Sequence, residues 1–422
     1  FAAKMAHWFH RNPLKATDFA KFDLKGILRN EQSSRICGEL RLRRDKFLKH
    51  LESASSDLEQ VETEFRQYLG LFYGFLFDVS EDGEKESKLR NLIRPIWGNS
   101  MIEKEGIELS DAWFEALSLI YNMAIWYMKH AAWNSAKDEV RDSEAKTIHT
   151  CLRKAAGLFE YIKDKTDLLC GLDDFPGNDF NMNVIKAYYY QCIAEAQEVT
   201  IARAIELKHA SGLISKLATE TARIYNECDE LIEKFNPSIF DKWRKYFQLK
   251  HKFYLAYAYA YLGESLLAED KCGQAVRACK EGIKCYQEAQ EICSEYPKAT
   301  GPGFIAKPEN HLFFRRIKPL LERHMEKAER ENGFIYHEPV PEACPELIQN
   351  ASYGLAKPDI FSYPQKADLW TKSAYDSFDI SKADTPDFSK AKKSKTKLPV
   401  VKEEKVYQTD KDPKNVSGCS IM

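Results

Sequence analysis

The residue with the clearest chemical potential is a cysteine four positions from the C-terminal end. Cys419-Ser-Ile-Met422 fits the C-a-a-X pattern for prenylation, and a terminal Met directs farnesyl transfer. The box follows a stretch with lysines at 390, 392, 393, 395, 397 and 402. A single lipid chain binds membranes only marginally, and each lysine near an anionic surface adds about 1 kcal/mol. The sequence therefore predicts a protein prenyltransferase as one partner and a membrane, reached through a farnesylated basic tail, as another.

The sequence offers little for catalysis. It contains no P-loop, H-E-x-x-H, G-x-S-x-G or Rossmann glycine pattern. His149 and Cys151 are too close in sequence to share a helix face, and Gly301-Pro-Gly303 fits a turn better than a phosphate loop. The cysteines between 279 and 293 lack the spacing of zinc ligands, so core packing explains them better. We therefore expect no enzyme, no cofactor and no metal site.

Several simple features indicate a cytoplasmic protein. The 11 cysteines form no C-x-x-C pair, and an odd number in a long chain argues against a disulfide scaffold. Lys4, His7 and His10 interrupt any apolar run that a signal peptide would need. Residues 68–77, the longest apolar stretch, have about half the roughly 20 residues of a membrane-spanning helix. A net charge of −2 offers no field for nucleic acid, which we exclude as a partner.

The elements that must position any site are helices. The 422 residues include only 19 Gly and 16 Pro, about 8% together against roughly 12% in average usage, and so few turn-formers favour long helices. Apolar residues recur at helical spacing from about residue 35 to residue 330. This pattern predicts helices over 110–128 with Ser110 as the cap, and over 182–207, 213–235, 253–268, 273–296 and 309–330, with Pro319 kinking the last.

One pair of these helices is similar to the tetratricopeptide repeat. The matching positions are Tyr259, Leu262, Gly263, Leu266, Ala275, Cys279 and Gly282. Since a single unit matches, a regular superhelical array is not expected, and an ordinary helical hairpin remains the alternative.

The amino-acid composition of the sequence changes after residue 331. Residues 333–375 alternate aromatics with prolines, which suits extended chain laid across a helical body. Residues 382–414 hold ten Lys against six Asp or Glu and few apolar residues, which predicts a disordered tail.

Four segments of the chain resemble the Bro-domain family: WFHRNPLKAT at 8–17, EAQEVTIARAIELKHA at 195–210, KWRKY at 242–246 and NGFIY at 332–336. The resemblance runs from about residue 5 to about residue 380. It implies an all-α, boomerang-shaped single domain over 5–381, with a tetratricopeptide-like core, minor β structure and an extended C-terminal segment. The lysine-rich tail over 382–422 would follow it and end in the C-a-a-X box.

The resemblance also implies a function, which is docking the C-terminal amphipathic helix of ESCRT-III subunits, the charged multivesicular body proteins. In family members an aromatic and two aliphatic residues line the groove, flanked by an acid and two lysines. The matching positions in this chain are Leu213 and Leu217 for the aliphatics, Thr200 for the aromatic, Asp142 for the acid, and Lys146 and Thr150 for the lysines. Two leucines at i and i+4 face one way and can receive an apolar ridge, although such pairs are more often core.

Two classes of function follow. The first is a non-enzymatic adaptor that docks an ESCRT-III helix at endosomal or nuclear-envelope membranes. The alternative is a membrane-tethered helical scaffold for an unrelated trafficking or cytoskeletal partner, and an enzyme is a distant third. An open groove floored by Leu213 and Leu217 would favour the adaptor, whereas a pocket of polar groups with shifted pKa values would favour the enzyme. Tyr336 matches a tyrosine that is a kinase substrate in family members, and a packed aromatic is the other interpretation.

Overall fold

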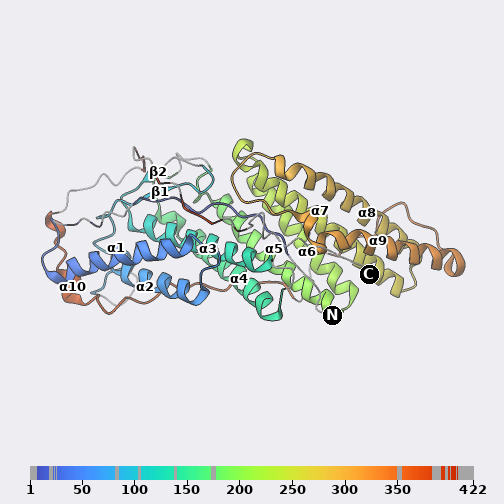
Figure 1. Ribbon diagram of the computed structural model, residues 1–422, viewed down its shortest axis with the longest axis horizontal. Helices are drawn as coiled ribbons and strands as arrows, with labels where there is room; N and C mark the ends of the chain where they lie inside the picture. The colour runs from blue at the N-terminus through green and yellow to red at the C-terminus, as the bar shows by residue number, and fades with distance from the viewer. Residues whose placement is uncertain are drawn as a thin grey trace, which may run out of the picture.

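The computed structural model describes residues 7–406 apart from gaps at 19–21, 23, 25, 81–84, 103–105, 137–139, 173–176, 349–353, 383–390, 395–397, 400 and 405. The predicted helical class is confirmed, and the body is elongated (Figure 1). Its α-helices are α1 Glu31–Leu51, α2 Leu58–Leu76, α3 Ala112–Ser135, α4 Asp142–Lys165, α5 Met182–Glu206, α6 Ser211–Ile232, α7 Pro237–Ala268, α8 Cys272–Glu295, α9 Leu312–Glu331 and α10 Lys372–Asp376. A small antiparallel sheet has the order β1 Ile96–Gly98, β2 Gly106–Glu108 and β3 Lys392–Lys393.

Helices α3 to α9 pack successively, each on the next, along the long axis (Figure 1). Helix α3 is capped by Asp111, whose side chain accepts a hydrogen bond from the N–H of Trp113, rather than by Ser110 as the sequence pattern predicted. It is buried on almost every side because α1, α2 and α4 all contact it. None of the helices in the described residues combines the length and apolar character that crossing a bilayer requires.

The helices that resemble the tetratricopeptide unit, α7 and α8, pack against each other. A Cβ at Gly263 would lie 2.7 Å from Sγ of Cys279 on the facing helix. A larger residue at this position would therefore force the Cys279 side chain to move. Pro319 lies inside α9, as the sequence predicted.

The Pro- and aromatic-rich segment is extended and crosses α4 and α2, as expected. The N–H of Asp359 donates to the carbonyl of Arg153 at 3.0 Å, and Nε1 of Trp370 donates to the carbonyl of Leu71 at 2.6 Å. Gly157 lies directly beneath this segment, where a Cβ would be only 1.8 Å from the carbonyl oxygen of Asp359. The backbone of the segment therefore lies directly on α4, in the space that the absence of a side chain at Gly157 leaves. At its start, Tyr336 ends a single π-helical turn and donates to Asp270 at 2.6 Å.

Part of the predicted tail also lies on the body. Residues 392 and 393 form β3 against β2, and Glu403 accepts a hydrogen bond from the N–H of Leu14 at 2.7 Å. The N–H of Glu404 donates to the carbonyl of Glu52 at 2.9 Å. The positions after 406, Cys419 among them, lie outside the described residues. The predicted disorder of those positions and the domain boundary at 381/382 stay predictions.

Candidate functional site

A cavity of about 520 Å³, called the groove below, opens between the start of α4, the C-terminal part of α5 and the start of α6. Five of the six positions that the family resemblance indicated line it: Asp142, Lys146, Thr200, Leu213 and Leu217. Thr150 is half-buried one turn beyond Lys146 and is not among the lining residues. Residues from three helices, up to 75 positions apart in sequence, therefore meet at one surface.

The floor of the groove comes from α6. Leu213 and Leu217 lie one turn apart on this helix, and both line the cavity. Leu213 is partly buried, whereas Leu217 is only 1% exposed and belongs to the hydrophobic core. Leu217 therefore supports the floor from below, while Leu213 supplies apolar surface that a ligand can cover.

The wall of the groove comes from α5. The hydroxyl of Thr200 donates to the carbonyl of Ala196 at 3.3 Å, so its polar atom is satisfied within its own helix. Val199 and Ala204, on either side, add apolar surface. The wall is consequently formed of small and apolar groups.

The mouth of the groove carries charges of both signs. Nη1 of Arg203 lies 3.1 Å from the carboxylate of Asp142 and 2.7 Å from that of Glu206. The Arg203 and Asp142 side chains are 44% and 70% exposed, and exposed pairs of this kind contribute about 0–1 kcal/mol. These charges can therefore exchange partners at little cost. Arg203 was not identified from the sequence, although its position three residues after Thr200 places it on the same face of α5.

The extended segment closes another side of the groove at Gly354. Gln197 of α5 holds this segment through both ends of its amide: Nε2 donates to the carbonyl of Gly354 at 2.9 Å, and Oε1 accepts from the N–H of Ala356 at 2.6 Å. Gln197 is 1% exposed, so water does not compete for these bonds. Gly354 has φ +79°, a left-handed conformation that favours glycine. No sequence signal linked residue 354 to the groove.

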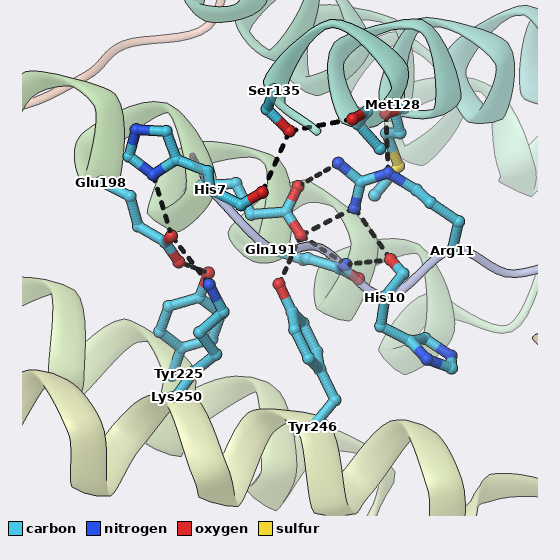
Figure 2. A network of polar contacts seen from close by, with 12 residues as sticks. His7, His10, Arg11, Met128, Ser135, Gln191, Glu198, Tyr225, Tyr246 and Lys250 are labelled. Carbon is cyan, nitrogen blue, oxygen red and sulfur yellow. Dashed lines mark hydrogen bonds and ion pairs between the residues drawn. The ribbon is translucent and has the colours of Figure 1, made fainter. Parts of the chain in front are cut away.

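A cluster of charged and polar side chains, shown in Figure 2, is buried inside the body and includes none of the residues that line the groove. Arg11 donates to both carboxylate oxygens of Glu195, at 2.8 and 2.7 Å, and the hydroxyl of Tyr246 donates to the same carboxylate at 2.7 Å. Nζ of Lys250 lies 2.8 Å from the carboxylate of Glu198, and this carboxylate also accepts a hydrogen bond from the hydroxyl of Tyr225. The cluster joins the N-terminal segment to α5 and α7.

The groups of this cluster are almost completely buried. His7, the most exposed of them, is 3% exposed, and Glu195 and Lys250 are completely buried. Burial alone would raise the pKa of Glu198, but Lys250 and His7 together hold it below its ordinary value. The cluster is therefore a structural network of mutually paired charges. In the described part of the chain, no group of three or more His, Cys, Asp or Glu is placed to hold a metal ion.

Comparison with known proteins gives a consistent result. The family model described as "BRO1-like domain" matches residues 83–387. A Caenorhabditis elegans protein, the BRO1 domain-containing protein BROX homolog, is 56% identical over 99% of this chain and 100% of its own length. The human BRO1 domain-containing protein BROX is 42% identical over 90% of this chain and 92% of its own length.

Solved structures share the fold. The ALIX BRO1 domain in its complex with CHMP4C matches 87% of this chain and 100% of that chain, with a TM-score of 0.63 and 18% identity. A Bro1 domain solved as the structural basis for endosomal targeting matches 89% of this chain and 98% of that chain, with a TM-score of 0.61 and 20% identity.

Proposed function

Because this chain belongs to the BRO1-like domain family, we propose that it is a non-enzymatic adaptor whose groove docks the C-terminal amphipathic helix of an ESCRT-III subunit. The observation that carries the proposal is the groove itself, with its apolar floor from α6, apolar wall from α5 and exposed charges at the mouth. An amphipathic helix needs this combination, because its apolar face must be buried while its flanks stay hydrated. The ALIX BRO1 domain was solved with CHMP4C, which supports a charged multivesicular body protein as the partner.

The second part of the proposal concerns the membrane. Farnesylation of Cys419 would add one lipid chain, which binds reversibly, and the lysines of the tail would supply the second attraction. Endosomal or nuclear-envelope membranes are the proposed location, and the endosomal targeting described for another Bro1 domain supports the first of them.

A complex in which one helix lies in one open groove is expected to be weak. One helix in one groove buries less area than the roughly 1,200–2,000 Å² of a standard stable interface, and the exposed rim charges add little. We therefore expect a dissociation constant of about 1–100 μM, which corresponds to about −5.5 to −8 kcal/mol, and rapid exchange. Such weak binding suits an adaptor that must release its partner.

Titration calorimetry with a peptide covering the C-terminal helix of CHMP4C tests the adaptor function. Leu213→Asp places a carboxylate on the floor of the groove and should reduce affinity at least tenfold. Leu42→Asp is the matched control, because Leu42 lies on α1, away from the groove, and is 69% exposed. An undiminished affinity in a folded Leu213→Asp protein would exclude the groove as the binding site.

A further inference from the structure

The described residues of the segment 391–406, called the strap below, are held on the body by three main contacts, in addition to the hydrogen bond of Glu404 to Glu52 and the burial of Val406. The first is the sheet. Lys392 and Lys393 pair with Glu108 and Ile107 of β2, and the N–H of Ser394 donates to the carbonyl of Gly106 at 2.8 Å. The strap therefore extends the sheet by one strand, although its composition alone predicted disorder.

The second place is a socket between β1 and β2. Gly98 and Gly106 are directly paired in this hairpin, and a Cβ on them would lie 3.1 and 3.3 Å from Cδ1 of Leu398. Leu398 is 9% exposed, so most of its apolar surface is removed from water. Two glycines opposite each other leave the room that the Leu398 side chain fills.

The third place is an ion pair in the interior. Glu403 pairs with the ammonium of Lys129 on α3, and the side chains are 8% and 3% exposed. The same carboxylate accepts a hydrogen bond from the N–H of Leu14 at 2.7 Å, and the ammonium lies 5.3 Å from the centre of the Phe304 ring. Burial, and to a lesser degree the nearby Arg11, lower the pKa of Lys129 and so disfavour its charged form. The strap supplies the carboxylate that lies against this ammonium.

We propose that the strap is a reversible clamp on the C-terminal end of the chain, with the Glu403–Lys129 pair as its latch. Closed, the clamp leaves 13 residues from Val406 to Cys419, a reach of at most about 45 Å. Opened back to Lys382, it leaves 37 residues and a reach of at most about 130 Å. The latch thereby sets how far the body can move from its membrane anchor. The proposal of a clamp does not require the lipid. The effect on the distance between body and membrane does, because it rests on the proposed farnesylation of Cys419.

Hydrogen exchange measured by mass spectrometry on the full, unlipidated chain tests the clamp. Glu403→Gln keeps the shape of the side chain and removes its charge, and Lys129→Met removes the ammonium. Each should speed exchange of strap amides such as those of Ser394 and Glu404 at least tenfold, while peptides from α3 exchange as in the wild type. Glu404→Gln is the matched control, because its exposed side chain only accepts from Ser53, and it should leave exchange unchanged.

Two results would overturn the proposal. Wild-type strap amides that exchange at the unprotected rate would mean that the strap is not docked. Strap protection that survives in both Glu403→Gln and Lys129→Met would mean that the pair is no latch. If either variant also exposes α3, Leu398→Ser provides a second test, since emptying the glycine socket should release the strap without leaving Lys129 uncompensated. Neither result depends on binding in the groove or on the lipid.

Discussion

Leu213 and Leu217 lie one turn apart on α6 and line the same groove, yet only Leu213 keeps part of its surface open while Leu217 is 1% exposed. Leu217 belongs to the hydrophobic core, and the extended segment also passes close to it, since a Cβ at Gly354 would lie 3.5 Å from its Cδ2. The two leucines therefore contribute unequally to folding and to binding. Substitutions at Leu217 measure both, whereas Leu213 is the cleaner probe of the surface.

Truncation of each leucine should reveal this difference. Leu217→Ala should lower the free energy of unfolding by about 2–5 kcal/mol, the cost of a cavity in a packed core. Leu213→Ala should cost about 1 kcal/mol or less, because part of that side chain is already in contact with water. Urea denaturation of both variants measures this, and equal losses would show that the two positions are not at different depths.

Enlarging Thr200 should change binding without changing the fold. Thr200→Phe adds apolar surface to the wall of the groove, and at about 25 cal/mol per Å² we expect affinity for the CHMP4C helix to rise three- to tenfold. Ser34→Phe, on the exposed face of α1 and away from the groove, is the control and should leave affinity unchanged. A loss of affinity in Thr200→Phe would instead mean that a side chain of the partner occupies the space beside Thr200.

The buried network should behave as a coupled unit. Lys250→Met leaves Glu198 without its cation, and Glu198→Gln leaves Lys250 without its anion, so each variant should lose about 3–5 kcal/mol of stability. The double variant removes both charges and should lose clearly less than the sum of the single losses. Chemical denaturation of the four proteins measures the coupling, and additive losses would contradict a direct pairing.

The sequence predicted the helices because their apolar periodicity is local information, which neighbouring residues carry. The family resemblance identified five residues that the structure brings together in the groove: Leu213, Leu217, Thr200, Asp142 and Lys146. Gly354 could not be predicted, because its place depends on where an extended segment with no periodicity crosses α5.

The strap was missed for a related physical reason. Lys129 and Glu403 are 274 residues apart, and no local pattern links a lysine on an apolar helix to an acid in a lysine-rich segment. Leu398 is likewise surrounded by polar neighbours and is buried only because two glycines face it from β1 and β2. Composition describes only the average character of the strap. Its docking depends instead on the side chains of Leu398, Glu403 and Lys129 and on the pairing of β3 with β2.

The last prediction concerns membrane attachment. Cys419→Ser removes the thiol that would carry the farnesyl group, so the variant should move to the soluble fraction, because the lysines alone attract too weakly to hold the body at a surface. Replacing Lys392, Lys393 and Lys402 with Gln keeps the lipid and should weaken attachment in a salt-dependent way, since exposed charges are screened within about 8 Å at physiological ionic strength. Metabolic labelling with a farnesyl analogue, followed by fractionation at low and high salt, measures both effects. A wild type that takes up no label, or a Cys419→Ser variant that stays on membranes, would show that the farnesyl group is not the anchor.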